Sequence, residues 1–321
     1  MVAVDLFLTN QCNKQCACCF VKEKAHGSSL TREDFDRIIP HLMRAKVDLV
    51  TLIGGEPTIY PELAYVTQGL RNNNIRYDIF SNGLFDARRL DGIVLEGVQV
   101  SVHLPSDART EKKAVENLEY LRKRKATAIL RDVISDGYNF SKAVRFIEKH
   151  RKYISGVRVK IAQPNLERSN EYLHDIVQVK TGLLTFLKIL DKMGMDLSNC
   201  CFLPYCEFSK NELNFLKSVN YLSRCQRVFY IDTDLTLKLC PYHNEAFGGL
   251  EDLGAVLARK HLIKIPVYEK CGSCDYHKRN ECIPCFSYSN SKDDLTGFRK
   301  VVLQDPIVCD QGKARIMGTG E

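Results

Sequence analysis

The sequence lacks any run of apolar residues long enough to span a membrane. Its first residues lead straight into a short apolar run at 2–9, without the basic region, apolar core and cleavage site of a secretory signal. It also lacks internal repeats and low-complexity segments. These absences predict a globular cytoplasmic protein with no membrane partner. A chain of 321 residues with 45% hydrophobic side chains is long enough for one large domain and a smaller one.

Cysteine, by contrast, is abundant, with 14 residues in the chain. In a reducing compartment, clustered cysteines are more often metal ligands than halves of disulfides. The formal net charge of +7 is modest, and the basic runs at 122–125 and 149–152 are typical of solvated helix faces. Charge therefore gives no strong indication of a nucleic-acid partner.

The first cysteine group is Cys12, Cys16 and Cys19, with C-x3-C-x2-C spacing directly after the run at 2–9. A loop of this length can place three thiolates on one iron–sulfur cube and leave the fourth iron without a protein ligand. A zinc knuckle or buried structural cysteines are the alternatives. Zinc usually takes four closed ligands, and no histidine follows at ligand spacing.

The first half of the chain alternates short β-rich runs with amphipathic helical patterns, which predicts βα units around a parallel sheet. We expect strands at 2–9, 47–53, 76–80, 97–102, 126–134 and 156–161. We expect helices from a cap at Ser29 or Thr31 to 44 and at 61–71, 86–94, 110–125, 141–152 and 172–193. Cysteines and loops dominate the rest of the chain, so we predict an α/β domain at 1–197 and a small cysteine-rich α+β domain at 198–321.

Candidate ligand residues follow the predicted strands, where parallel α/β folds bind their ligands. Gly54 and Gly55 allow close approach of the backbone to a ligand, and Glu56 offers a carboxylate to an ammonium group. A tight turn is the alternative for this segment. The polar residues at the next three strands are Ser81, Asn82, Ser101 and Arg131, for which strand-end caps or ion pairs are the alternative.

The cysteine loop, followed by Gly54-Gly55-Glu56-Pro57 after the second strand, resembles the radical S-adenosylmethionine (radical SAM) superfamily. The resemblance implies a partial (β/α)6 barrel with a [4Fe–4S] cluster on the three cysteines and S-adenosylmethionine on the open iron. One electron, from an external reductant such as flavodoxin or ferredoxin, would cleave it to a 5′-deoxyadenosyl radical that abstracts a substrate hydrogen. Gly54, Gly55 and Glu56 would bind its amino group. Ser81, Asn82, Ser101 and Arg131 would contact the rest of the molecule. In one departure, Cys18 replaces the aromatic residue usual before the third cysteine, and Phe20 follows.

The C-terminal cysteines are similar to the SPASM extension of this superfamily, which carries two auxiliary [4Fe–4S] clusters. By order along the chain, the first cluster would be held by Cys225, Cys240, Cys285 and one upstream thiolate. Cys206 is the preferred upstream ligand, and Cys200 and Cys201 are the alternatives. The second would be held by Cys271, Cys274, Cys282 and Cys309. The gaps around Cys282 differ from the usual pattern, so a single-cluster twitch version stays open. A zinc ribbon is the further alternative, because two C-x2-C pairs are present.

The predicted function is that of a radical SAM oxidoreductase that oxidises a peptide by dehydrogenation or crosslinking, because auxiliary clusters suit removal of an electron. The chain shows no extra N-terminal domain of the kind that many peptide maturases use to grip a leader. Oxidation of a small molecule, such as an aminocyclitol or a sugar alcohol, is therefore the alternative. A non-catalytic iron–sulfur electron carrier is the alternative from another class, and nucleic-acid modification ranks below it. His103, Asp132 and His243 are candidates for a proton acceptor, although each residue type is more often solvated or structural, and no catalytic acid or base is assigned.

Overall fold

The computed structural model describes residues 1–16, 19, 21, 28–105, 107–162, 176–198, 205–222, 229–239, 246–259, 267–268, 271, 273–279, 281–282, 300–301, 309–310 and 313–314. Only the main chain is described for residues 176, 178, 259, 267–268, 300–301, 309–310 and 313–314. In this part of the chain, no helix has both the length and the apolar composition needed to cross a bilayer.

A nine-stranded sheet in the order β7-β6-β5-β4-β3-β2-β1-β8-β9 forms the frame of the molecule. Neighbouring strands from β7 to β8 are parallel, and β9 is antiparallel to β8. The strands are β1 (Ala3–Phe7), β2 (Leu49–Ile53), β3 (Arg76–Phe80), β4 (Gln99–His103), β5 (Thr127–Ile134), β6 (Gly156–Ile161), β7 (Asp196–Ser198), β8 (Tyr230–Ile231) and β9 (Leu237–Lys238). Strands β1 to β6 are the six expected βα strands, and the fold is the predicted partial barrel.

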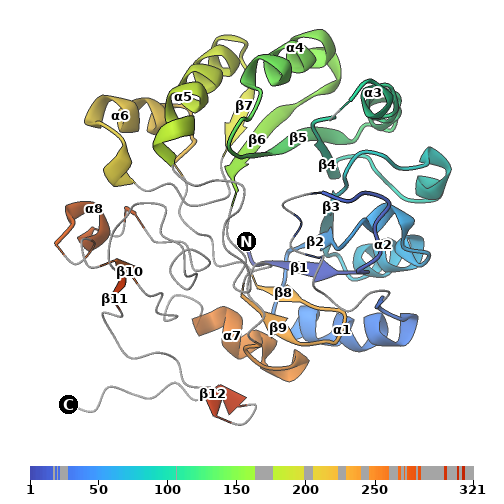
Figure 1. Cartoon of the computed structure of the whole chain (residues 1–321). Coiled ribbons are helices and arrows are strands. Elements are labelled where there is room, and N and C mark those ends of the chain that lie inside the picture. The colour runs from blue at the N-terminus through green and yellow to red at the C-terminus, as the bar shows by residue number, and fades with distance from the viewer. Residues whose placement is uncertain are drawn as a thin grey trace, which may run out of the picture.

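The helices that connect the parallel strands lie along one side of the curved sheet, as Figure 1 shows. They are α1 (Arg32–Arg44), α2 (Leu63–Asn72), α3 (Ala108–Lys123), α4 (Phe140–His150) and α5 (Ile176–Lys192). Short 3-10 turns accompany them: η1 (Pro57–Ile59), η2 (Ala87–Leu90) and η3 (Arg151–Tyr153).

Local capping explains where several helices begin. Thr31 caps α1: its hydroxyl accepts the Asp34 N–H at 3.0 Å, and the Asp34 carboxylate accepts the Thr31 N–H at 3.0 Å. Such a capping box satisfies two donors that the first turn leaves unpaired. Asp107 caps α3 through the Thr110 N–H at 2.9 Å. The predicted cap at Thr31 is confirmed, whereas Ser29 instead forms a β-bridge with Thr9.

The helix expected at 86–94 is wrong, because the structure has only the 3-10 turn η2 there. Asp86 caps this turn, and Gly92 follows it with a φ of +79°. A residue in that left-handed region ends a right-handed helix. The apolar residues that suggested a helix, Leu90 and Ile93, are buried all the same.

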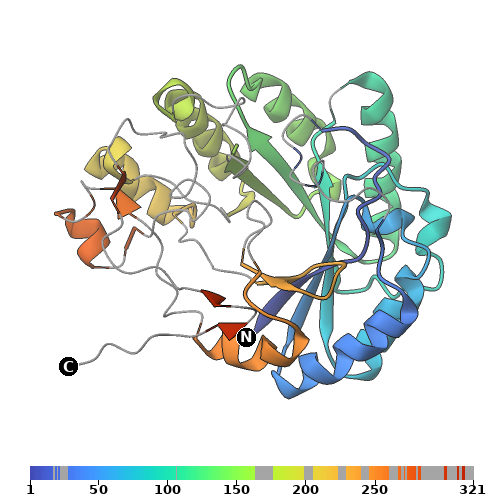
Figure 2. The same ribbon diagram turned by 60° about the horizontal axis from the view of Figure 1, so that its bottom comes forward.

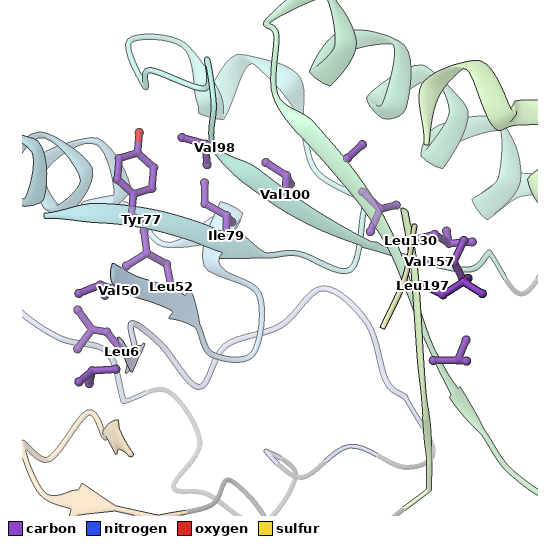
Figure 3. Packing of buried hydrophobic residues seen from close by; sticks show 14 of the residues in the cluster. Leu6, Val50, Leu52, Tyr77, Ile79, Val98, Val100, Leu130, Val157 and Leu197 are labelled. Atoms are coloured by element: carbon purple, nitrogen blue, oxygen red, sulfur yellow. The ribbon is translucent and has the colours of Figure 1, made fainter. Parts of the chain in front are cut away.

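Successive side chains of a strand point to opposite sides. The face covered by the helices is apolar, and the other face combines polar side chains with the apolar Phe7, Ile53 and Tyr230. Alternate residues pack against the helices and form the main core. Figure 3 shows members of this core: Leu6, Val50, Leu52, Tyr77, Ile79, Val98, Val100, Leu130, Val157 and Leu197. The intervening positions include Asp78, Ser101, Arg131 and Lys160. This polar row on the helix-free face supplies the residues of the candidate site.

The chain continues past the sheet into short elements. They are η4 (Tyr205–Glu207), α6 (Lys210–Ser218), η5 (Leu250–Asp252), α7 (Leu253–Arg259) and α8 (Asp275–Lys278), with the two-residue strands β10 (Val267–Tyr268), β11 (Lys300–Val301), β12 (Cys309–Asp310) and β13 (Lys313–Ala314). Of these elements, α6 lies beside α5 and α7 lies beside α1 (Figures 1 and 2). Strand β7 spans the predicted boundary at residue 197, and β8 returns to pair with β1. The division into 1–197 and 198–321 stays a prediction.

Candidate functional site

The loop that carries Cys12, Cys16 and Cys19 leaves the carboxyl end of β1 and is tied at both ends. Thr9 and Ser29 form an isolated antiparallel bridge, with their hydroxyls 2.7 Å apart. Because the two ends of the loop are fixed to each other, the loop has fewer accessible conformations, and its cysteines stay close to the carboxyl end of β1.

The Cys12 and Cys19 thiols each accept a main-chain N–H. The Cys19 N–H donates to the Cys16 carbonyl at 3.3 Å, and the Val21 N–H donates to the Cys19 sulfur at 3.4 Å. The Lys14 main-chain N–H donates to the Cys12 sulfur, and Cys12 and Cys19 are close enough to interact electrostatically. Burial raises the pKa of the Cys12 thiol above its usual value, against the opposing effect of that N–H donor. Such donors to sulfur stabilise a metal-bound thiolate.

Gly54 and Gly55 bring the chain after β2 into main-chain contact with this loop. The Gly55 N–H donates to the Thr9 carbonyl at 2.7 Å, and the Glu56 N–H donates to the Gln11 carbonyl at 2.9 Å. A Cβ at Gly54 would lie 2.5 Å from the Thr9 oxygen, and one at Gly55 would lie 2.1 Å from the Gln11 oxygen. The glycines therefore allow two backbone segments to meet, a role that neither the ligand nor the tight-turn interpretation had included.

Glu56 is 0% exposed and links the ends of β2 and β3. One carboxylate oxygen accepts the Thr58 N–H at 3.1 Å and the Thr58 hydroxyl at 2.6 Å; the other accepts the Asn82 N–H at 2.6 Å. The Ser81 hydroxyl also donates to this carboxylate. Burial raises the pKa of Glu56, although each of these donors opposes the shift. The carboxylate is thus engaged inside the protein in this structure, and its expected offer to an ammonium group stays a prediction.

Asn82 connects the end of β3 to the cysteine loop. Its side-chain amide donates to the Asn13 side-chain oxygen at 2.7 Å and lies 3.8 Å from the Cys12 sulfur, and its own oxygen accepts the Leu84 N–H at 2.8 Å. Ser81, also buried, accepts the Gly83 N–H at 3.0 Å. The structure thus brings Asn82 to the cysteine loop and gives Ser81 a role in holding the strand end.

Arg131 and Ser101 meet on the helix-free face of the sheet. The Arg131 guanidinium lies over the Phe80 ring, 3.8 Å from its centroid, and its Nε donates to the Ser101 hydroxyl. Strand pairing sets Phe80 beside Ser101 and His103 beside Arg131. Burial raises the pKa of the Asp78 carboxyl above its usual value. Attraction to the nearby Arg131 guanidinium opposes part of that rise. The two predicted residues therefore form one small cationic group.

His103 is the candidate proton acceptor that lies on this face. Burial, followed by the nearby charges of Lys14, Lys160 and Arg131, lowers the pKa of His103 to about 4. Its imidazole is therefore neutral at pH 7, and the low pKa makes it a weak proton acceptor. Burial raises the pKa of Asp132, which accepts the Tyr138 hydroxyl at 2.8 Å. His243 lies outside the described residues.

A small apolar cluster surrounds Cys19 on the same side of the sheet. Its buried members are Phe7, Val21, Ile53 and Tyr230, and Cys19 and Phe80 pack against them. The Phe7 and Tyr230 rings lie 5.1 Å apart. These aromatic residues were missed from the sequence, because Tyr230 reaches Phe7 only through the long-range pairing of β8 with β1. Cys18 and Phe20, singled out as the departure from the family pattern, lie outside the described residues.

Of the C-terminal cysteines, the structure describes the side chains of Cys206, Cys271, Cys274 and Cys282, which are thiols rather than halves of disulfides. Cys309 lies in β12, of which only the main chain is described. Outside the described residues lie Cys200, Cys201, Cys225, Cys240 and Cys285. Among the described side chains, no three of His, Cys, Asp and Glu converge tightly enough to ligate one metal ion.

Residues 6–177, more than half of the chain, match the radical SAM superfamily, and the protein belongs to that superfamily. Membership implies a [4Fe–4S] cluster and binding of S-adenosylmethionine. The residues after β1 fit such a cluster, because a cube distributes its thiolates over separate irons and needs no convergence on one ion. The closed loop, its N–H donors to sulfur and the apolar cluster around Cys19 also fit.

The whole fold is similar to that of two solved SPASM-type radical SAM enzymes. Streptococcus suis SuiB bound to its precursor peptide SuiA has a TM-score of 0.67 at 13% identity, over 86% of this chain and 70% of SuiB. The enzyme anSMEcpe with bound AdoMet and Kp18Cys peptide has a TM-score of 0.68 at 16% identity, over 93% of this chain and 92% of its own.

A curated relative is a Methanocaldococcus jannaschii protein named provisionally as a glycyl-radical enzyme activating enzyme. It is 24% identical over 123 residues, which are 36% of this chain and 48% of the relative. The match therefore spans about half the length of that relative.

Proposed function

We propose that the protein is a radical SAM oxidoreductase that removes hydrogen from a peptide, by dehydrogenation or by forming a crosslink. The proposal of a peptide substrate rests on the extent of the structural similarity. It continues far beyond residue 177, where the family match ends, in two enzymes whose structures hold peptides. An external one-electron donor such as flavodoxin or ferredoxin is part of the proposal, as are auxiliary clusters in a C-terminal domain at 198–321.

Cys12, Cys16 and Cys19 would hold the cluster, in the loop fixed by the Thr9–Ser29 bridge. When bound, the cluster and S-adenosylmethionine supply the electron and the 5′-deoxyadenosyl group for hydrogen abstraction. The main-chain carbonyls of Gly54 and Gly55 would accept the amino group of S-adenosylmethionine. Glu56 would hold the ends of β2 and β3 in register.

On the helix-free face, Arg131 and Ser101 would bind an anionic or hydroxyl group of S-adenosylmethionine, with the guanidinium oriented by the Phe80 ring. Of the candidate proton acceptors, His103 lies on this face, and its pKa of about 4 makes it a weak base for the proton that the oxidised substrate would release. The apolar cluster of Phe7, Val21, Ile53 and Tyr230 would exclude water from the cysteine loop. Each group is thus assigned to binding, orientation, proton transfer or exclusion of water.

The test is to incubate the anaerobically reduced protein and S-adenosylmethionine with short peptides encoded beside its gene, and to measure the mass of each peptide. We expect one peptide to lose two hydrogens in step with 5′-deoxyadenosine formation, and we expect Cys16→Ala to abolish both. Unchanged peptides beside slow, uncoupled 5′-deoxyadenosine formation would overturn the peptide substrate and favour a sugar alcohol or aminocyclitol. No cleavage of S-adenosylmethionine by reduced wild-type protein would favour an electron carrier.

A further inference from the structure

Cys271, Cys274 and Cys282 are gathered around the short helix α8. The Cys274 N–H donates to the Cys271 carbonyl at 3.1 Å, which closes a turn between the two cysteines. Cys274 then caps α8, with the Lys278 N–H on its carbonyl at 2.9 Å. After the helix, the Cys282 N–H donates to the Tyr276 carbonyl at 3.1 Å, so the chain folds back toward the first two cysteines.

Cys206 reaches the same place from η4, more than sixty residues earlier in the chain. The ring of its neighbour Tyr205 packs edge-on against the Tyr276 ring, with centroids 5.6 Å apart. The Tyr205 main-chain N–H donates to the Cys282 sulfur, and Cys282 interacts electrostatically with the thiols of Cys206, Cys271 and Cys274. In both ribbon views α8 lies beside α6, into which η4 leads (Figures 1 and 2).

We propose that Cys206, Cys271, Cys274 and Cys282 together hold one iron–sulfur cluster. This ligand set differs from the order-based expectation, which paired Cys206 with Cys225, Cys240 and Cys285 and gave Cys309 to the second cluster. Four thiols collected from two distant segments form a set of sulfur ligands, and a cationic metal centre would stabilise their thiolate forms. The proposal rests on the auxiliary clusters of the proposed function, but it is independent of the substrate and of S-adenosylmethionine cleavage.

A cluster suits this group better than a single zinc ion. Zinc needs four sulfurs at about 2.3 Å from one point, and no three of the described thiols converge in that way. The loop of Cys12, Cys16 and Cys19 has the same open arrangement. With all four ligands from the protein, the cluster would have no open iron, and its chemistry would be electron transfer. Cys225, Cys240 and Cys285 would then take a fourth ligand from Cys200, Cys201 or Cys309.

The test uses pairs of substitutions in the full-length protein, reconstituted anaerobically with iron and sulfide, and measures iron and acid-labile sulfide per chain. If Cys206 and Cys274 serve the same cluster, Cys206→Ala with Cys274→Ala loses no more iron than Cys274→Ala alone, about four atoms. The matched pair, Cys206→Ala with Cys240→Ala, loses about eight, because two clusters are affected. Mössbauer spectra of ⁵⁷Fe-labelled protein identify which cluster signal disappears.

The reverse pattern, with the second pair equal to Cys240→Ala alone, would overturn the proposal and restore the order-based set. Iron, sulfide and spectrum unchanged by Cys206→Ala would also overturn it, as would zinc in place of iron at this group. Cys206→Ser, which keeps the side-chain volume and supplies a weaker oxygen ligand, is the second variant. We expect it to keep the native circular dichroism and to alter only the cluster spectrum, which separates ligand loss from misfolding.

Discussion

Substitution of Gly55 by alanine should lower the free energy of unfolding and, at the same time, disturb the cysteine loop. The added Cβ would lie 2.1 Å from the Gln11 carbonyl oxygen and 3.0 Å from that of Asn10. The first distance is more than 1 Å short of ordinary contact, and both obstacles are backbone atoms that no side-chain rotation can move. Overpacking costs about 1–3 kcal/mol, and weakening the Gly55 N–H bond to Thr9 adds about 1 kcal/mol. We expect a loss of about 2–4 kcal/mol.

The assay is anaerobic urea unfolding followed by circular dichroism, with iron per chain measured on the same samples. Gly254→Ala is the matched control, because Gly254 lies in α7 with no atom within 4 Å of the added Cβ. Alanine favours a helix, so this control should gain up to about 1 kcal/mol and keep its iron. A Gly55→Ala protein that unfolds like the wild type and carries as much iron would refute the contact between the two segments as the reason for glycine.

Three further results are expected. Glu56→Gln places an amide group against a donor such as the Asn82 N–H, so the free energy of unfolding should fall by about 1–3 kcal/mol in the same assay; no change would contradict the buried carboxylate network. The pKa of His103 falls from 6.5 to about 4 on folding, so the unfolded chain binds more protons in that window. Stability should therefore drop as pH falls from 6.5 to 4, by up to about 3 kcal/mol, and a pH-independent difference between wild type and His103→Asn would count against this. Arg131→Lys loses the planar stack on Phe80 and should raise the KM for S-adenosylmethionine roughly tenfold with unchanged iron; an unchanged KM would remove Arg131 from that site.

The alternation of strands and helices was readable from the sequence because local signals agree with the fold. The run at 76–80 and the run at 156–161 became β3 and β6 without any shift, and Thr31 caps α1 as predicted. The spacing of Cys12, Cys16 and Cys19 likewise indicated the superfamily that residues 6–177 match.

What the sequence could not give depends on contacts between distant segments. Nothing near Glu56 indicates that Asn82 and Ser81 would occupy its carboxylate, and nothing near Gly55 indicates that Gln11 lies against it. The order of the C-terminal cysteines likewise carries no information on which ones meet in space. Cys206 comes near Cys282 only because Tyr205 packs on Tyr276.

The pairing of β8 with β1 has a consequence for synthesis of the chain. Asp5 pairs with Tyr230, so one edge of the first strand is covered by a strand that is made more than 220 residues later. Until then, the nascent protein presents an unpaired edge beside its cysteine loop, and such edges are sites of aggregation. A ribosome-bound chain shorter than about 230 residues would therefore depend on chaperones, or on early capture of iron and sulfide, to keep that edge from pairing with another chain.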